Sequence, residues 1–351
     1  MSEFRGAIVL CLDRAERGGV LMRTIRQANC LREAFPEQSV TLAYYSATGS
    51  ADFTDAKVPV CQMSYRLLTS LSKEVGPVVV FAMAGRALVK LIPLRLITPG
   101  LYVSVFQAVP LTLPGRSKLK NMLRAWLACA LYKQADAVVC VSRELQRDLV
   151  ASFGLHQAVH IPNPAGFESS EPGQDRQGRD VGLLRVVAAG RLDFQKNYEL
   201  IIEAISLCNG RVQLDIYGDG PDRDQLAVLI ERFGLGDCVK LMGNVPVVPY
   251  ERYSCFLMVS RWEGLPSAMI EAATCGLRCV AYACPTGPID IFLSGARGCL
   301  FFQSKAEAIK DALLDESNDY AGDLDRLRHT YSAQRIAHEL NALAARLSFS
   351  E

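Results

Sequence analysis

Two glutamates that lie eight residues apart mark the part of the sequence best suited to chemistry. They belong to the segment Arg261-Trp-Glu-Gly-Leu-Pro-Ser-Ala-Met-Ile-Glu. The apolar run before it, residues 255–260, is short and ends in a polar residue, so we expect a buried strand there. Pro266 suits the first helical position, because its missing N–H would have no helical partner. Glu263 is therefore predicted in a strand-to-helix loop, and Glu271 just over one turn inside the helix.

The same loop offers backbone donors. The amides of Gly264 and Leu265 lie beside the predicted helix N-terminus, where unpaired N–H groups and the helix dipole favour a phosphate. Carboxylates accept hydrogen bonds from hydroxyl groups, such as those of a sugar. Two carboxylates around a phosphate seat therefore predict a receptor for a nucleotide-linked sugar. The alternative is an ordinary helix-start glutamate and a surface glutamate.

Two cations five residues apart follow an earlier strand candidate. After the apolar run 184–189, Gly190 allows a sharp turn, and Arg191 and Lys196 come next. Their spacing predicts that both converge on one anion, such as a departing nucleoside diphosphate. The alternative is a strand-loop-helix with ordinary surface cations. Further along, Gly218 ends another strand candidate, where a glycine lets the backbone approach a ligand or simply forms a turn.

Short apolar runs alternate with helix-like stretches, a pattern typical of parallel α/β units. The strand candidates are residues 7–11, 40–45, 78–82, 102–106, 137–141, 159–161, 184–189, 213–217, 239–242, 256–260, 279–282 and 299–302. The predicted fold class is α/β, with two doubly wound Rossmann-like domains that face a central cleft. The predicted divisions are a first domain (1–165), a polar linker (166–182), a second domain (183–330) and a C-terminal helix (331–351), with the option that this helix returns to the first domain.

Length and composition limit the class of protein. Single hydrophobic cores rarely grow past about 250 residues, so 351 residues predict two domains. No run approaches the ~20 apolar residues that span a bilayer, and the N-terminus lacks signal-peptide features. Twelve scattered cysteines in mostly apolar surroundings favour reduced thiols and a cytosolic protein. Residues 1–170 carry 19 Lys and Arg against 12 Asp and Glu, but without a basic stripe interleaved with aromatics, so we expect no nucleic acid partner.

Several motifs, taken together, resemble the retaining nucleotide-sugar glycosyltransferases of the GT-B fold, family 4 (glycosyl transferases group 1). They are Gly190-Arg191 with Lys196-Asn197, Gly218-Asp219-Gly220-Pro221, residues 260–266, residues 271–276 and Gly287-Pro288, so the resemblance covers roughly residues 184–300. It implies that Arg191 and Lys196 hold the donor diphosphate, that Glu263 contacts the donor sugar and that Glu271 contacts the ribose. Arg191, Lys196 and Glu263 are thereby assigned to catalysis, and Gly190, Gly218, Gly264, Leu265 and Glu271 to donor binding. The resemblance also implies retention of configuration without a metal or other cofactor.

The first half of the chain resembles the same family more loosely. Residues 16–20 look like the glycine-rich loop after the first strand, which implies that Gly18 and Gly19 bind the donor and that Arg17 lies on the acceptor side. Many relatives carry a histidine after the fourth strand, where this chain has Gln107. Gln107 is assigned to the acceptor side as a hydrogen-bonding group, because an amide cannot act as a base.

Residues 118–131 form an amphipathic stretch with apolar positions at helical spacing, bordered by basic residues. A helix buried in the first domain explains the apolar positions. Contact with an anionic lipid surface is the alternative, since the basic residues and Trp126 suit a membrane interface.

The sequence thus predicts a glycosyltransferase that moves a hexose or N-acetylhexosamine from a nucleotide diphosphate sugar, UDP-linked by family frequency. The expected acceptor is a glycan or a polyprenyl-diphosphate-linked glycan in surface polysaccharide or lipopolysaccharide biosynthesis. The expected location is cytoplasmic, at the inner face of the cytoplasmic membrane. The alternatives are a non-catalytic sugar-nucleotide-binding subunit of a glycosyltransferase complex, and an enzyme of the same fold that performs phosphorolysis or epimerisation.

Overall fold

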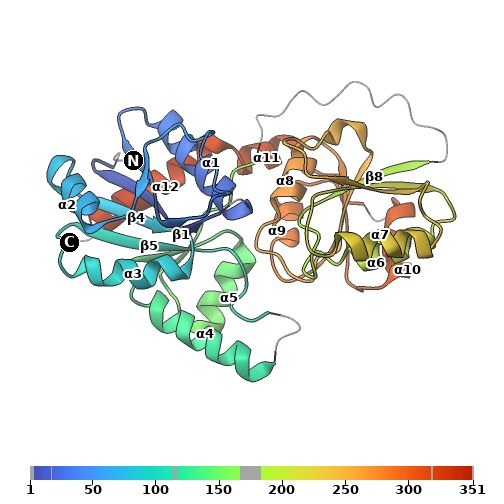
Figure 1. Ribbon diagram of the computed structural model, residues 1–351, viewed down its shortest axis with the longest axis horizontal. Helices are drawn as coiled ribbons and strands as arrows, with labels where there is room; N and C mark the ends of the chain where they lie inside the picture. The colour runs from blue at the N-terminus through green and yellow to red at the C-terminus, as the bar shows by residue number, and fades with distance from the viewer. Residues whose placement is uncertain (1–3, 17, 114–116, 167–182, 318, 350–351) are drawn as a thin grey trace. The chain divides into compact units, whose positions relative to one another are not determined.

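The computed structural model describes residues 4–16, 18–113, 117–166, 183–317 and 319–349. The chain divides into two compact units, which Figure 1 shows in colour along the chain. Unit 1 comprises Met1–Pro164 and Tyr331–Glu351, and unit 2 comprises Ala165–Thr330. The predicted linker, residues 166–182, lies outside the described residues except for Gly166.

Unit 1 contains a parallel sheet with the strand order β3-β2-β1-β4-β5-β6-β7 among the described residues. Its strands are β1 (Ala7–Ala15), β2 (Ser39–Ala47), β3 (Val60–Gln62), β4 (Val78–Ala82), β5 (Leu101–Gln107), β6 (Ala137–Cys140) and β7 (Ala158–His160). The central strand β4 is buried at every position, as expected for an apolar run in a sheet covered on both faces.

The helices of unit 1 pack against this sheet in two groups. Four of them share a hydrophobic core with the sheet: α2 (Tyr65–Glu74), α3 (Gly85–Arg95), α4 (Lys118–Tyr132) and α5 (Arg143–Phe153). The helices α1 (Gly19–Ala34) and α12 (Ala333–Ser348) pack against each other and against the strands. The C-terminal helix α12 therefore belongs to the core of unit 1, with Ile336 and Leu340 fully buried.

Unit 2 contains a second parallel sheet, with the order β10-β9-β8-β11-β12-β13 among its described residues. Its strands are β8 (Leu184–Ala189), β9 (Val212–Tyr217), β10 (Val239–Gly243), β11 (Cys255–Met258), β12 (Arg278–Tyr282) and β13 (Gly298–Phe301). Its helices are α6 (Tyr198–Ser206), α7 (Arg223–Arg232), the 3-10 turn η1 (Tyr250–Arg252), α8 (Ser267–Thr274), α9 (Pro288–Leu293), α10 (Ala306–Leu314) and α11 (Leu324–Thr330). Helices α6, α7 and α10 share one core with this sheet, while α8 packs on β11 and β12.

The predicted fold class, two parallel α/β domains of Rossmann type, is confirmed. Every predicted strand is present, and the boundaries of β4 and β8 match those predicted. The sequence-based prediction missed β3, because a strand of three residues, two partly buried and one exposed, is too short to give a periodic signal. It also ended β1 four residues early, since the polar residues Asp13 and Arg14 interrupt the apolar run.

The histidine at the end of β7 predicts a pH-dependent stability for unit 1. Burial, together with the positive charges of Arg143 and Arg335, lowers the pKa of His160 from 6.5 to about 4. Between these values the unfolded chain binds a proton that the folded chain does not. The contribution of His160 to the free energy of unfolding is therefore fully present above pH ~6.5. It falls by about 2–3 kcal/mol as the pH decreases towards 4.

Urea unfolding at several pH values tests this prediction. His160→Gln is expected to flatten the decline in unfolding free energy between pH ~6.5 and 4, because the titrating group is gone. The exposed His156 offers the control variant His156→Gln, which should keep the decline. Identical pH profiles for wild type and His160→Gln would show that other groups cause the decline.

Candidate active site

The candidate site lies at the carboxyl ends of β8 and β11. These strands are direct neighbours, although β9 and β10 separate them in the sequence. After β8 the chain forms β9 and β10 on one side of that strand, and it then crosses back to form β11 on the other side. Such a switch point leaves a crevice at the carboxyl ends, where ligands of parallel α/β sheets bind. The loops 190–197 and 259–266 therefore emerge next to each other.

An ion pair joins these two loops. Lys196 Nζ lies 2.6 Å from Glu263 Oε1, and the two side chains are 19% and 7% exposed. Gln195 supports the pair, since its Nε2 donates to the carbonyl of Trp262 at 2.9 Å and reaches Glu263 Oε2 at 3.5 Å. The sequence predicted a role for each partner, but not that they touch. The site thus presents a cation and a carboxylate side by side at the carboxyl ends of β8 and β11.

Local backbone geometry within loop 190–197 places Lys196 next to loop 259–266. The carboxylate of Asp193 accepts hydrogen bonds from the amides of Gln195 and Lys196. The next residue, Asn197, has a φ of 58° and precedes α6, a left-handed conformation that asparagine tolerates better than most residues. Its side chain donates to the carbonyl of Val259 at 3.4 Å. The turn therefore ties the end of loop 190–197 to the end of β11.

A third segment supports Glu263 from the other side. The amide of Glu263 donates to the carbonyl of Pro285 at 2.8 Å, and the hydroxyl of Thr286 donates to the carbonyl of Glu263 at 2.8 Å. Gly287 has a φ of 95°, and a Cβ there would lie 2.6 Å from the carbonyl oxygen of Gly264. The sequence signal for this segment was a turn rich in proline and glycine. Its contacts show that the turn holds the Glu263 loop in place.

Four amides around the start of α8 donate no hydrogen bond within the described part of the chain. They belong to Gly264, Leu265, Ser267 and Ala268. The helix begins at Ser267 with Pro266 as its N-cap, so the prediction that Pro266 is the first helical residue was wrong by one position. The physical reason is its ψ of 105°, which keeps Pro266 extended while its carbonyl accepts the first helical hydrogen bonds. Unpaired amides at a helix N-terminus favour an anion.

Glu271 lies on α8 and has a partner that the sequence-based prediction missed. The hydroxyl of Tyr250 in η1 donates to Glu271 Oε2 at 3.4 Å. Burial, and then the negative charge of Glu271, raise the pKa of Tyr250 well above its usual value. Tyr250 therefore stays a protonated donor that orients the carboxylate. Its only sequence signal is an aromatic residue shortly before an apolar strand.

Arg191 is placed differently from Lys196. Its side chain is 73% exposed, and its Nε lies 3.6 Å from Asp193 Oδ2. The structure thus pairs Lys196 with Glu263 and Arg191 with Asp193. The predicted convergence of both cations on one anion stays a prediction. An exposed side chain of this length is free to reorient at little energetic cost.

Two glycines pack the ends of β8 and β9 closely enough to shape the site. Gly218 has a φ of 135°, and a Cβ there would lie 1.9 Å from the carbonyl oxygen of Gly190. Gly218→Ala combines a strained backbone with a backbone clash, so we expect a loss of about 2–4 kcal/mol in unfolding free energy. Urea unfolding measures it. Gly236→Ala is the control, because a Cβ at Gly236 meets nothing within 4 Å, and equal losses for both variants would contradict the packing argument.

Two predicted site residues of unit 1 lie at the start of α1, and a third lies at the end of β5. Gly18 is the N-cap of α1 and Gly19 its first residue, and a Cβ at either would meet nothing within 4 Å. Arg17 lies outside the described residues. Gln107 is buried at the end of β5, where its amide accepts from the Tyr132 hydroxyl and donates to the Val109 carbonyl. Both ends of Gln107 are therefore engaged within unit 1, and its acceptor-side role stays a prediction.

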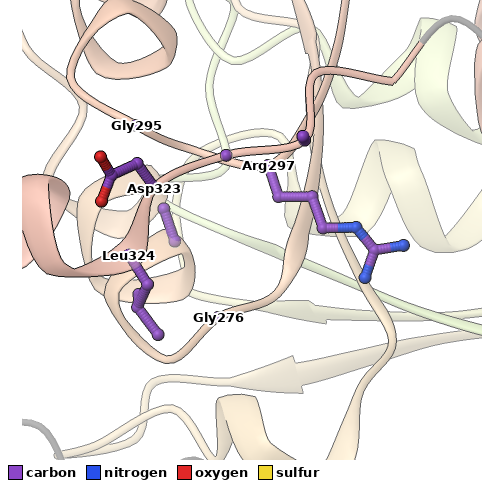
Figure 2. A pocket seen from close by; sticks show the side chains of 8 residues that line it. Gly276, Gly295, Arg297, Asp323 and Leu324 are labelled. Carbon is purple, nitrogen blue, oxygen red and sulfur yellow. The ribbon is translucent and has the colours of Figure 1, made fainter.

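A separate pocket of about 300 Å³ lies elsewhere in unit 2 (Figure 2). Its lining includes Gly276, just before β12, and Gly295 and Arg297, just before β13. It therefore lies at the amino ends of these strands, away from the switch-point crevice. Figure 2 shows the Arg297 guanidinium and the Asp323 carboxylate pointing in different directions, so they do not form a joint charged site. Among the described residues, no group of three or more His, Cys, Asp and Glu side chains is placed to hold a metal ion.

Comparison with known proteins gives a matching family and several similar proteins. Residues 173–334 match the family described as glycosyl transferases group 1. The amylovoran biosynthesis glycosyltransferase AmsD of Erwinia amylovora is 30% identical over 46% of this chain and 47% of its own. The Campylobacter jejuni enzyme named N-acetylgalactosamine-N,N'-diacetylbacillosaminyl-diphospho-undecaprenol 4-alpha-N-acetylgalactosaminyltransferase is 26% identical over 62% of this chain and 59% of its own. The matches thus span only about half the length of these curated relatives.

Similarity to solved structures extends further along the chain. The crystal structure of Anabaena HepE in complex with UDP and glucose has a TM-score of 0.70 and 18% identity, and the match covers 96% of this chain and 97% of HepE. At this identity the likeness concerns the fold. The chain therefore has the GT-B fold, and its residues 173–334 match the family described as glycosyl transferases group 1.

Proposed function

We propose that this protein is a retaining glycosyltransferase that moves a hexose or N-acetylhexosamine from a UDP-sugar to a glycan or a lipid-linked glycan. The proposed setting is the assembly of a surface polysaccharide or lipopolysaccharide at the cytoplasmic face of the membrane. Support for the donor comes from HepE, which was solved with UDP and glucose. Support for the acceptor and the setting comes from the relatives named for amylovoran biosynthesis and for a diphospho-undecaprenol acceptor.

One observation carries the proposal: the contact between Lys196 and Glu263 beside the four unpaired amides of the α8 N-terminus. In a nucleotide sugar, hydroxyl groups that hydrogen-bond to a carboxylate lie next to a diphosphate that binds cations and amides. The bond that breaks lies between these two parts. A carboxylate and a cation 2.6 Å apart match that junction better than either residue alone would.

The proposed reaction needs little covalent help from the protein. The bond between C1 of the sugar and the diphosphate oxygen breaks, and the acceptor hydroxyl oxygen forms a bond to C1 on the same face. The hydroxyl proton passes to an oxygen of the departing diphosphate. Lys196 and the amides at the start of α8 stabilise the charge that develops on this diphosphate, and preorganised donors lower the barrier most. Glu263 orients the sugar through its hydroxyls.

Glu271 is proposed to bind the ribose hydroxyls of the donor. Glu271→Gln is expected to weaken UDP binding about tenfold, because charge-assisted hydrogen bonds to the hydroxyls are lost. Tyr250→Phe removes only the hydroxyl that orients Glu271, so a smaller loss of affinity is expected. Isothermal titration calorimetry with UDP measures both. Unchanged affinity in Glu271→Gln would place the ribose elsewhere.

A thermal-shift screen against UDP-, GDP-, ADP- and dTDP-sugars, without added metal, tests the donor. Saturation at about 100 times the dissociation constant stabilises a fold by ~2.7 kcal/mol. The proposal predicts a clear shift with UDP-sugars, followed by slow release of UDP from the same sugar when no acceptor is present. A shift without any release or transfer would instead support a non-catalytic binding subunit. No shift with any UDP-sugar would contradict the proposed donor.

A further inference from the structure

Helix α4 in unit 1 has two apolar faces, of which only one is covered. Small and aromatic side chains form the covered face: Ala125, Cys129 and Tyr132 are buried in the core of unit 1. Large apolar side chains form the other face. Leu119, Met122, Leu123, Trp126 and Leu127 are 53–73% exposed. The expectation that burial explains the apolar positions of residues 118–131 was therefore wrong for the larger face.

The exposed positions form a continuous stripe. At 100° per residue, the spacing of Leu119, Met122, Leu123 and Trp126 follows the i, i+3, i+4, i+7 pattern of one helix face. A stripe of five large side chains is not the scattered apolar exposure that every soluble surface shows. The buried stripe adjoins the exposed one, and its small residues Ala125 and Cys129 allow α4 to pack against α3 in the core of unit 1. The outer stripe is thus left for another surface to cover.

Positive charge surrounds this stripe. Residues 118–133 contain four basic residues and no acidic residue. Lys118 and Lys120 lie on opposite flanks of the exposed stripe by the same helical spacing, and both are exposed. Lys133 follows the last helical residue and is also exposed. Their long side chains can extend from the flanks while the apolar stripe is buried. The covering surface should therefore be apolar inside and anionic at its boundary.

We propose that α4 docks this protein on an anionic lipid bilayer, lying in the interface plane with Leu119, Met122, Leu123 and Trp126 at the boundary of headgroups and acyl chains. Trp126 suits this depth, since tryptophan is favoured where one side is apolar and the other wet. The geometry is that of an interfacial helix. Among the described residues no helix has both the length and the apolarity to cross a membrane. A second copy of this chain fits less well, because pairing two such helices brings their lysines together.

This inference stands apart from the proposed sugar transfer. It rests on α4 alone, and vesicle binding can be measured without a donor or an acceptor. If both hold, docking brings unit 1 to the surface where a lipid-linked acceptor resides.

Vesicle flotation of the full chain tests the proposal. We compare vesicles of phosphatidylcholine alone with vesicles of phosphatidylcholine and phosphatidylglycerol in equal amounts. Binding to the anionic vesicles is expected, and it should weaken as salt screens the lysines. Lys118→Gln with Lys120→Gln should weaken partitioning about 30-fold, since each lysine near an anionic surface contributes about five- to sixfold. Leu123→Gln with Trp126→Gln should weaken it about 100-fold, because the apolar insertion is lost.

Controls separate docking from folding. Val228→Gln changes an equally exposed apolar residue, 65% exposed on α7 of unit 2, and should bind as wild type does. Thermal unfolding should show that Leu123→Gln with Trp126→Gln folds normally, because both side chains are exposed. In a Trp262→Phe background Trp126 is the one tryptophan left, and brominated lipids should quench its fluorescence. Absence of binding to anionic vesicles, equal binding by all variants, or a wild-type dimer that the double variant converts to monomer without any vesicle binding would each overturn the proposal.

Discussion

Replacing Lys196 with methionine is expected to reduce sugar transfer by at least about 100-fold. Methionine keeps much of the side-chain volume and removes the charge that is proposed to stabilise the departing diphosphate. The same change leaves Glu263, which is 7% exposed, without its ionic partner. A buried carboxylate without a partner is costly, so a loss of about 2–4 kcal/mol in unfolding free energy is expected as well. Initial rates with a UDP-sugar and denaturant unfolding measure the two effects.

A second variant separates the two effects. Lys196→Met combined with Glu263→Gln removes both charges, so most of the lost stability should return while transfer stays low. Gln225→Ala, which removes an exposed hydrogen bond to Glu199 and touches neither partner of the pair, serves as an activity control. Wild-type turnover in Lys196→Met would remove Lys196 from the catalytic site. Recovery of transfer in the double variant would show that the pair acts only on stability.

Replacing Arg278 with methionine is expected to cost unit 2 about 3–5 kcal/mol of unfolding free energy. Arg278 begins β12 and is 2% exposed. Its guanidinium forms a bidentate pair with Asp319 at 2.6 and 2.8 Å and also donates to the carbonyls of Ala312, Leu313 and Asp315. The change leaves a carboxylate and three carbonyls without their donor. The end of α10 and the segment after it then lose their attachment to the sheet.

The control for this prediction is an exposed pair in the same unit. Arg297 lies 3.7 Å from Glu316, and the two side chains are 44% and 54% exposed. Arg297→Met should change the unfolding free energy by less than about 1 kcal/mol, because water screens exposed pairs. Arg278→Met with Asp319→Leu should recover part of the loss, since no charge stays buried. Urea midpoints measure all three variants, and similar midpoints for Arg278→Met and Arg297→Met would refute the argument.

Much of the fold could be predicted from local sequence. The run 78–82 is uninterruptedly apolar and the run 184–189 is apolar except for Arg185, and they became β4 and β8 with unchanged bounds. The positions of loop residues could also be predicted from local sequence. Gly190, Glu263 and Gly264 follow predicted strands, so they had to lie at the carboxyl ends of those strands. The helix that starts near Pro266 was also found, with an error of one residue, because N-cap and first helical position differ only in ψ.

Contacts between residues that are distant in the sequence could be identified only from the tertiary structure. Lys196 and Glu263 are 67 positions apart and meet because β8 and β11 are neighbours at the switch point. Tyr250 reaches Glu271, and Asp319 reaches Arg278, through turns that carry no periodic signal. The helical pattern of α4 was visible in the sequence, but periodicity does not say which of two apolar faces a neighbour covers. That choice depends on the shape of the space beside α3 and the sheet, which only the folded chain defines.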